Sequence, residues 1–377
     1  MIEQKSGVKI DLGGLLEEMI ARDASDLHLA VNSPPLFRID GRLVCVDRHL
    51  LAPEHTQKLA YSMITEKQKQ IFEEKKELDF SFGLKDRARF RVNIYVERGS
   101  VAVAVRRLPV EIPSFNRLGL PPIVSEMAAY PRGLVLVTGP TGSGKSTTLA
   151  AMIDRINRER SVHIITIEDP IEYVHEHKRS LVNQREVTLD TESFKGALKY
   201  ILRQDPDVVL IGEMRDLETV EAALTIAETG HLVLATLHTN SCAQTINRII
   251  DVFPAHQQVQ VRVQLSLSLE AVLSQMLLPK IGGGRVMAME VMVCTPAIRA
   301  LIRDDKIHQI YSLIQVGGRY GMKTMSQSLF ELVEKGAIST YEAMMRSPDP
   351  KELDTMLEKR RQTGSSAGRG ERRAGRP

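Results

Sequence analysis

The chain has 377 residues, of which 43% are hydrophobic and 26% are charged, and its formal net charge is +3. This length predicts two or three domains of about 150 residues each, and the composition is ordinary for a globular protein. Without residues 359–377, which hold seven Lys and Arg and one acid, the chain has 43 basic and 46 acidic residues, a net charge of −3. A body of this charge does not favour a nucleic-acid partner.

The sequence contains neither a candidate membrane helix nor a signal-peptide pattern. No stretch approaches the roughly 18 consecutive apolar residues of a membrane helix, and the opening MIEQKSGVKI lacks the apolar core of a signal peptide. Cys45, Cys242 and Cys294 lie far apart and match neither a zinc ligand set nor a disulfide framework. We therefore expect a cytoplasmic protein with buried free thiols and no zinc.

Residues 1–108 alternate short helical and strand patterns, which predicts an α+β domain at the N-terminus. Residues 109–122 follow, and their four prolines predict an inter-domain linker. The helices of the first domain are expected at 12–21 and 54–75, and its strands at 26–30, at 36–46 with a turn at Asp40-Gly41, and at 80–82, 89–96 and 100–108 with a turn at Arg98-Gly99.

From Gly133 onward, nearly continuous apolar strands alternate with helices. This pattern predicts an α/β domain over residues 123–357, with a parallel sheet covered by helices on both faces. Beyond Asp251 we expect mostly helix, with one hairpin at residues 282–284. Residues 358–377 are basic and rich in Gly and Ser, so we expect a disordered tail. The strands of the sheet are expected at 133–138, 163–168, 207–212 and 231–236, and the helices at 145–158, 193–203, 217–228 and from about 243.

The stretch GPTGSGKSTT (139–148) matches the phosphate-loop pattern GxxxxGK[ST]. An apolar strand enters it and a good helix leaves it, which distinguishes such a loop from a simple glycine turn before a helix. Backbone N–H groups and the helix N-terminus would surround the phosphates. Lys145 would reach the β- and γ-phosphates, and the Ser146 hydroxyl would ligate Mg²⁺. The expected ATP-binding residues are Gly139, Pro140, Thr141, Gly142, Ser143, Gly144, Lys145, Ser146 and Thr147.

Polar side chains follow three of the expected strands. Since ligand groups in an open parallel sheet lie beyond the carboxyl ends of the strands, these residues are candidates for positioning water and metal. Each one alone could instead be a helix cap, a surface carboxylate or a hydrogen-bonded histidine. The candidates are Glu168, Asp169 and Glu172 after the second strand, Glu213 after the third, and His238 and Thr239 after the fourth.

The third of these strands lacks a common feature of phosphate-handling enzymes. An aspartate that holds magnesium often stands where DVVLIGEMRD (207–216) has Gly212, followed by Glu213. From the residues alone, Glu213 and the carboxylates after the neighbouring strand are the alternatives for that work.

The stretch from about Gly133 to Asp251 resembles the secretion-ATPase superfamily, a family of RecA-like hexameric motors, and is most similar to type IV pilus retraction ATPases of the twitching-motility type. The resemblance extends over nearly the whole chain to about residue 357, including a PAS-like N-terminal domain at SDLHL. AIRALIRDDK (297–306) is similar to a block of retraction motors, with Ala300 and Asp304 as departures. The matching blocks are GPTGSGKSTT, TIEDPIEY (166–173), DPDVVLIGEMRD (205–216) and TGHLVLATLHT (229–239).

The resemblance implies a role for each candidate residue. Glu172 would be the general base for the attacking water, and Glu213 would hold Mg²⁺, through a water molecule. His238 would sense the γ-phosphate, with His231 supporting it. A glycine at the position of Gly212 is normal in that family, so it implies a subfamily of motor and not an inactive enzyme.

Arginines near the linker are further candidates. Arg91 and Arg106 lie on successive expected strands, and Arg98 lies at the turn between them. Alternating arginines on strands commonly form a solvated face. By resemblance, some of them would reach the γ-phosphate of ATP in their own or a neighbouring subunit, where such a residue can raise the rate ~10³–10⁵-fold. A shared site would explain a closed ring, with the 109–122 linker as hinge.

The sequence and the resemblance together therefore predict a homo-hexameric, Mg²⁺-dependent ATPase whose domain movements retract the type IV pilus. The motor would act at the cytoplasmic face of the inner membrane, on the platform protein of the pilus. The alternatives are a pilus assembly or type II secretion ATPase, an accessory retraction motor that works with a paralogue, a RecA-like nucleic-acid motor, and a nucleotide-binding module without turnover. Assembly motors commonly carry a four-cysteine zinc insertion, which three scattered cysteines cannot form.

Overall fold

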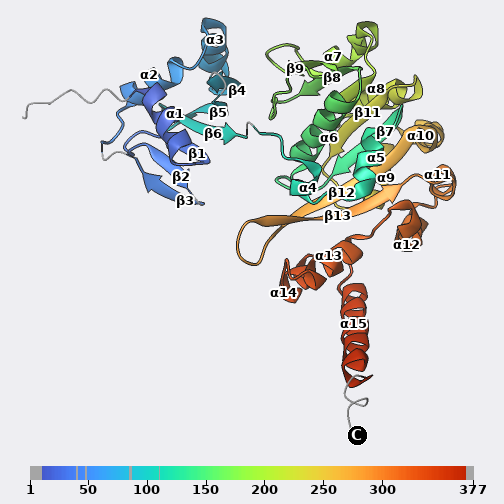
Figure 1. Ribbon diagram of the computed structural model, residues 1–377. Coiled ribbons are helices and arrows are strands. Elements are labelled where there is room, and N and C mark those ends of the chain that lie inside the picture. The colour runs from blue at the N-terminus through green and yellow to red at the C-terminus, as the bar shows by residue number, and fades with distance from the viewer. Residues whose placement is uncertain (1–10, 40, 47–48, 85–86, 110, 371–377) are drawn as a thin grey trace, which may run out of the picture. The chain divides into compact units, whose positions relative to one another are not determined.

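The computed structural model describes residues 11–39, 41–46, 49–84, 87–109 and 111–370, and the side chains of 361–370 are outside the description. The chain divides into two compact units, Met1–Glu111 with Pro170–Val174, and Ile112–Asp169 with His175–Pro377. Figure 1 colours them from blue to red along the chain. The boundary after Glu111 lies inside the segment predicted to be a linker.

The first unit is an α+β domain built on a six-stranded sheet in the order β3-β2-β1-β6-β5-β4, in which neighbouring strands are antiparallel. In strand β5, buried residues alternate with half-buried ones, so one face of the sheet packs on the hydrophobic core. Phe90, Val92 and Ile94 belong to this core. The strands are β1 (Asp26–Leu29), β2 (Leu36–Ile39), β3 (Arg42–Cys45), β4 (Glu77–Leu84), β5 (Ala88–Glu97) and β6 (Ser100–Leu108), and the helices are α1 (Leu12–Ala21), α2 (Pro53–Tyr61) and α3 (Glu66–Lys75).

Two expectations for this unit change. The single helix expected at 54–75 is two helices, because Thr65 accepts a hydrogen bond from the Gln68 amide while the Gln68 side chain accepts one from the Thr65 amide, and this capping box starts α3 anew. Cys45 is exposed, not buried, because β3 lies at the edge of the sheet. Asp40 of the predicted turn lies outside the described residues.

The second unit is built on a seven-stranded sheet in the order β13-β12-β7-β11-β10-β8-β9. All neighbours pair in parallel except the edge strand β13, which is antiparallel to β12. The strands are β7 (Gly133–Thr138), β8 (His163–Glu168), β9 (Leu181–Glu186), β10 (Val208–Ile211), β11 (Leu232–Leu237), β12 (Leu269–Pro279) and β13 (Arg285–Val293).

Helices cover both faces of this sheet (Figure 1). On β7, Val135 and Val137 pack with α5 and α6, while Leu134 and Leu136 belong to the core on the face of α7 to α12. The predicted two-sided α/β domain is confirmed. The helices are α4 (Phe115–Leu118), α5 (Pro122–Ala128), α6 (Lys145–Glu159), α7 (Phe194–Ile201), α8 (Leu217–Glu228), α9 (Cys242–Asp251), α10 (Ala255–Ser268), α11 (Pro296–Arg303), α12 (Ile310–Val316), α13 (Met325–Glu334), α14 (Thr340–Arg346) and α15 (Pro350–Gly370), and 3₁₀ turns lie at Leu202–Gln204, Ile307–Gln309 and Gly318–Tyr320.

The region beyond Asp251 differs from the sequence-based expectation. The hairpin around residues 282–284 is present, but its strands are long, and β12 pairs with β7 inside the sheet. Strand β12 is buried on both faces, so its sequence lacks the alternation that would have marked it as a strand. Strand β9 was also missed, because its polar sequence LVNQRE is typical of a sheet edge.

The disorder predicted from residue 358 is wrong up to Gly370, where α15 ends. Leu353 and Leu357 are buried in the core formed with α13 and α14. Packing therefore fixes the first turns of α15. Residues 371–377 lie outside the described part of the chain. Among the residues described, no helix has the length and hydrophobicity needed to cross a membrane.

Candidate active site

The phosphate loop occupies residues 139–144, between β7 and α6. Gly144 has φ +89° and Gly139 has φ +142°, backbone conformations that residues other than glycine rarely adopt. A Cβ on Gly139 would lie 2.2 Å from the backbone oxygen of Gln275, so only glycine fits there. All nine predicted ATP-binding residues therefore lie in this loop and the first turn of a 15-residue helix. Aligned helix N–H groups there favour an anion.

Lys145 is 9% exposed and points back across the loop. Its Nζ donates to the carbonyl oxygens of Gly139, at 2.9 Å, and Pro140, at 3.2 Å. The same Nζ lies 3.4 Å from Nδ1 of His238, which follows β11. The ammonium group is thus held between the loop and the carboxyl end of a neighbouring strand, the position from which it can meet phosphate oxygens.

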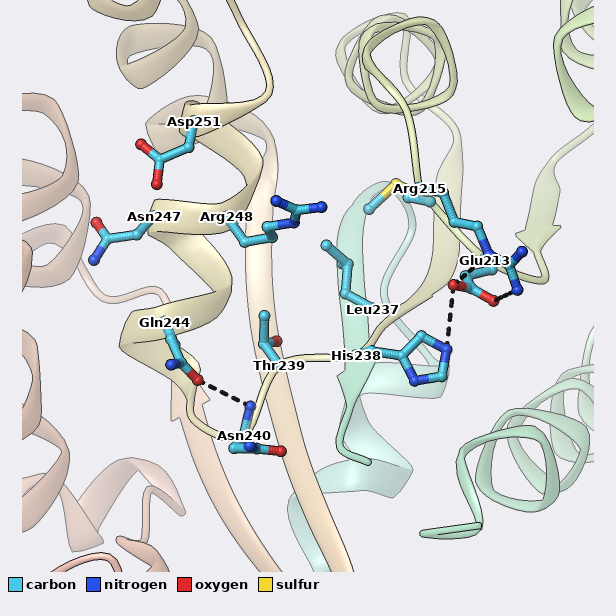
Figure 2. A pocket seen from close by; sticks show the side chains of 11 residues that line it. Glu213, Arg215, Leu237, His238, Thr239, Asn240, Gln244, Asn247, Arg248 and Asp251 are labelled. Atoms are coloured by element: carbon cyan, nitrogen blue, oxygen red, sulfur yellow. Dashed lines mark hydrogen bonds and ion pairs between the residues drawn. The ribbon is translucent and has the colours of Figure 1, made fainter. Parts of the chain in front are cut away.

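Glu213 and His238 form the second half of the site. His238 Nε2 lies 3.2 Å from Glu213 Oε1, and Arg215 Nε lies 2.6 Å from the same oxygen (Figure 2). A neutral imidazole with its proton on Nε2 satisfies both Lys145 and Glu213. Burial alone would raise the pKa of Glu213, but the Arg215 hydrogen bond and the charges around it lower that pKa overall. Glu213 is therefore ionised at neutral pH.

The backbone contacts of Gly212 hold the next residue, Glu213, beside His238 and Arg215. Its N–H donates to the Ile167 oxygen of β8 at 2.8 Å, and its own oxygen accepts from Thr236 Oγ1 of β11 at 2.6 Å. A Cβ on Gly212 would lie 3.1 Å from the Ile167 oxygen and 3.2 Å from Glu168 Cα. The close approach of β8 therefore leaves little room for a side chain at residue 212, and the first carboxylate after β10 comes one residue later.

The substitution Gly212→Asp tests this packing. We expect it to lower the free energy of unfolding by about 1–3 kcal/mol, as overpacking does, and to lower ATP turnover because Glu213 shifts with the backbone. Denaturant unfolding and turnover should be measured beside Gly318→Ala, a control position where an added Cβ meets nothing within 4 Å. Wild-type stability of Gly212→Asp would contradict the steric explanation.

The carboxylates after β8 have different surroundings. Glu168 Oε1 accepts from Thr166 Oγ1 at 2.7 Å and from Gln184 Nε2 at 3.1 Å. Glu172 is half-buried and stands in the segment Pro170–Val174. Glu168 is thus already engaged in the sheet, whereas Glu172 lies on a connection without regular secondary structure.

The residues that follow Glu172 are hydrogen-bonded to α6. The buried Asn157 side chain donates to the Glu176 oxygen at 2.7 Å and accepts from the Lys178 N–H at 3.1 Å. Asp154, one turn earlier, pairs with Lys178 and with Arg158. The helix that begins at the phosphate loop therefore holds the chain just beyond Glu172.

His175 lies in this anchored segment and is 9% exposed. Burial, as the largest cause, lowers its pKa from 6.5 to about 4, with Lys178 acting in the same direction and Asp154 against it. Because the pKa is lower in the folded state, the unfolded chain binds more protons between pH 6.5 and pH 4. His175 therefore contributes stability above pH 6.5 that is lost as the pH falls through this window.

The change from pH 7 to pH 5 should cost about 2 kcal/mol of unfolding free energy through His175. We expect the melting temperature of wild type to fall more over this range than that of His175→Gln. His308→Gln, a change at an exposed histidine, serves as the control and should keep the wild-type slope. Parallel slopes for wild type and His175→Gln would contradict the assignment.

A cavity of about 600 Å³, lined mostly by polar and charged residues, adjoins the Glu213–His238 pair. One wall is the side of α9, and the opposite wall is formed by the ends of β10 and β11 (Figure 2). Its lining residues are Glu213, Met214, Arg215, Leu237, His238, Thr239, Asn240, Gln244, Asn247, Arg248 and Asp251. Phosphate loop, lysine, carboxylate, histidine and an adjoining polar cavity meet at one edge of the sheet.

The sequence profile of the type II/IV secretion system protein family matches residues 2–345. The chain belongs to this family. It is 51% identical to the type IV pilus retraction ATPase PilT of Pseudomonas aeruginosa over 341 residues, which are 90% of this chain and 99% of that protein. It is 42% identical to the type IV pilus ATPase PilU of the same organism, with 91% of this chain and 90% of that protein covered.

A solved structure of the pilus retraction motor PilT with bound ADP has a TM-score of 0.87 and 56% identity, and the match covers 93% of this chain and all of that one. The secretion-family fold, a RecA-like P-loop domain preceded by a PAS-like domain, is therefore that of this chain. The predicted fold class is confirmed.

The two histidines predicted for this site lie at different places. His231 precedes β11, where its oxygen accepts from the Gly133 N–H and its Nδ1 lies 3.0 Å from the Ile226 oxygen. His238 follows the other end of β11. Since a strand rises about 3.3 Å per residue, the two histidines lie about 20 Å apart. His231 cannot support His238 by direct contact within one chain.

The predicted arginines lie in the first unit. Arg91 is on β5, with its Nε 4.0 Å from Asp79 Oδ1, and Arg106 is on β6, with its Nε 2.8 Å from Asp26 Oδ1. Arg98 occupies the turn between these strands with φ +49°. Each is at least partly exposed. An ion pair within the unit accounts for Arg106, and the γ-phosphate role stays a prediction for all three.

The predicted metal ligands fit a magnesium ion that is shared with a nucleotide. Ser146 supplies a hydroxyl in the first turn of α6, and Glu213 supplies an ionised carboxylate. Mg²⁺ is commonly held by one or two such oxygen ligands together with phosphates and water. No cluster of three or more His, Cys, Asp or Glu side chains suited to a metal occurs within the described residues.

Sequence reasoning missed Arg215 and Gln275. Arg215 binds Glu213, and its place two residues after that carboxylate, at a strand end, was a usable signal. Gln275 contacts the phosphate loop from β12. Its one signal was an amide inside the apolar run AVLSQMLLP, since a buried amide needs partners.

Proposed function

We propose that this chain is an ATPase motor that powers the retraction of type IV pili, and that it works with Mg²⁺ as a homo-hexamer at the cytoplasmic face of the inner membrane. The observation that carries the proposal is the phosphate loop with Lys145 facing the Glu213–His238 pair, in a chain 51% identical to a retraction ATPase over nearly all of that protein. The ATPase activity named for that relative is consistent with the phosphate-binding geometry of this site.

ATP would lie with its β- and γ-phosphates on the loop N–H groups and on Lys145. Bound Mg²⁺, held by Ser146 and, through water, by Glu213, would neutralise charge on the phosphates. Glu172 would accept the proton of the attacking water. Its neighbourhood supports this role because Glu168, the alternative in the same segment, already accepts two hydrogen bonds.

His238 would report the state of the γ-phosphate. Its ring contacts Lys145 through Nδ1 and Glu213 through Nε2. A phosphate that draws Lys145 away would remove the partner of Nδ1 and favour reorientation of the ring. Arg91, Arg98 and Arg106 would add positive charge at the γ-phosphate, in the same or a neighbouring subunit, and the domain boundary within 109–122 would act as the hinge between the two domains.

An accessory retraction motor is the second candidate; the chain is also 42% identical to a second type IV pilus ATPase, PilU. In that case the chain would need a paralogous motor to retract pili. The inner-membrane platform protein of the pilus is the expected partner in both cases.

The test combines two measurements on the full chain. Purified protein should hydrolyse ATP with added Mg²⁺ and should have the native mass of a hexamer. Expression in a piliated bacterium that lacks its own retraction motors should restore twitching. Twitching restored only when a paralogue is present would indicate the accessory role, and turnover without any retraction would contradict a pilus function.

A further inference from the structure

Gln275 is a buried amide beside the phosphate loop. It is 1% exposed and stands in β12, one residue after Ser274, which pairs with Thr138 at the end of β7. Since β7 and β12 run parallel, Gln275 lies next to the first residues of the loop. Residues 275–279 of β12 thus extend beyond the end of β7.

The Gln275 carboxamide makes one contact with each of its ends. Nε2 donates to the backbone oxygen of Ser143 in the loop at 2.7 Å. Oε1 accepts from Thr148 Oγ1 in the first turn of α6 at 3.0 Å. One side chain from β12 therefore ties the loop to the helix that follows it.

Two further contacts bring the same residue against the loop glycines. The Gln275 backbone oxygen lies 2.2 Å from the position of a Cβ on Gly139, and Nε2 lies 3.3 Å from that of a Cβ on Gly144. The first distance excludes a side chain at residue 139, and the second is shorter than most Cβ contacts. The loop is therefore packed against Gln275 at its beginning and at its end.

The hydrogen bond to Ser143 has a consequence for the adjacent N–H group. In a trans peptide the C=O of one residue and the N–H of the next point in opposite directions. Because the Ser143 oxygen is directed to Gln275, the Gly144 N–H is directed away from β12. Loop N–H groups of this kind are the groups that bind phosphate.

We infer that Gln275 is a positioning residue for the phosphate loop, which fixes the peptide between Ser143 and Gly144 and thereby the direction of the Gly144 N–H. The inference rests on the proposed nucleotide-binding function. Gln275 does not touch the nucleotide itself in this arrangement. It acts on binding through the loop backbone.

Two substitutions separate this role from simple packing. Gln275→Glu keeps the size and can still accept from Thr148, but it loses the donor to Ser143. Gln275→Leu removes both hydrogen bonds without adding charge. Ser274→Ala is the matched control, because Ser274 is the preceding buried residue of the same strand and its Oγ has no hydrogen-bond partner among the described residues.

The experiment measures the Kd for the fluorescent nucleotide mant-ADP and the kcat and KM for ATP, with native mass and melting temperature as checks of folding. We expect both Gln275 variants to bind mant-ADP about tenfold more weakly, as loss of such a hydrogen bond predicts, with a similar rise in KM and a smaller change in kcat. Ser274→Ala should match wild type. A purely structural role would instead lower melting temperature and kcat without this selective loss of affinity.

Other outcomes would distinguish a failure of this inference from a failure of the proposed function. If folded Gln275 variants bind mant-ADP like wild type, the inference is overturned and the proposed function stands. If wild type neither binds mant-ADP nor hydrolyses ATP, the proposed function itself fails. Should both Gln275 variants fail to fold, Thr148→Val removes one of the two bonds from the helix side, and an unchanged Kd for that variant would count against the positioning role.

Discussion

Glu172→Gln is expected to lower ATP turnover by about 10²–10⁴-fold, the contribution of a general base, while ATP remains bound. Glutamine has the same shape but cannot accept a proton from water. The phosphate loop and Lys145 are untouched, so the Kd for mant-ADP should stay near the wild-type value. Steady-state turnover and nucleotide binding on the same sample check the prediction, with native mass as the measure of assembly.

The matched control for this variant is Glu176→Gln, which changes an exposed carboxylate four residues later in the same connection. It should retain wild-type turnover. Full turnover in Glu172→Gln would show that another group activates the water, and Glu168→Gln would then be the next variant to measure.

Lys145→Ala is expected to weaken nucleotide binding about 100-fold or more. The ammonium group would form charge-assisted hydrogen bonds to two phosphates, each worth about 1.5–3 kcal/mol, and a loss near 3 kcal/mol corresponds to about two powers of ten in Kd. Turnover at ordinary ATP concentrations should become undetectable. Titration with mant-ADP measures the effect directly.

Lys145 also holds the carbonyl oxygens of Gly139 and Pro140, so the alanine variant could disturb the loop. Lys145→Gln retains a donor for these oxygens without the charge, and it should be nearly as defective if the charge is what matters. Lys199→Ala, a change at an exposed lysine of α7, controls for the general loss of a positive charge. Tight binding by Lys145→Gln would refute a direct contact with phosphate.

Local patterns in the sequence predicted most of the second unit. A phosphate loop between an apolar strand and a helix has few alternative structures, and the alternation of β5 in the first unit follows directly from one buried face. Strand β12 was different. A strand buried on both faces is as uniformly apolar as a buried helix, so only its pairing with β7 identifies it.

The phosphate loop and the polar residues that follow the strand ends were predictable from the sequence, whereas contacts that depend on the register between distant strands were not. Gln275 contacts Ser143 across 132 positions of sequence, and that contact depends on the register between β12 and β7. The two histidines of TGHLVLATLHT show that closeness in sequence does not ensure closeness in space. Seven positions separate them in one compact motif, yet His231 precedes the extended strand β11 and His238 follows it, so they lie at opposite ends of that strand.

Helix α6 has attachments near both of its ends. Thr148 in its first turn binds Gln275, and Asn157 near its last turn binds the chain just beyond Glu172. A helix of 15 residues is about 22 Å long and stiff along its axis. It therefore connects the phosphate loop to the base of the segment that carries the proposed catalytic carboxylate, so a shift of the loop along the helix axis would be expected to displace that segment as well.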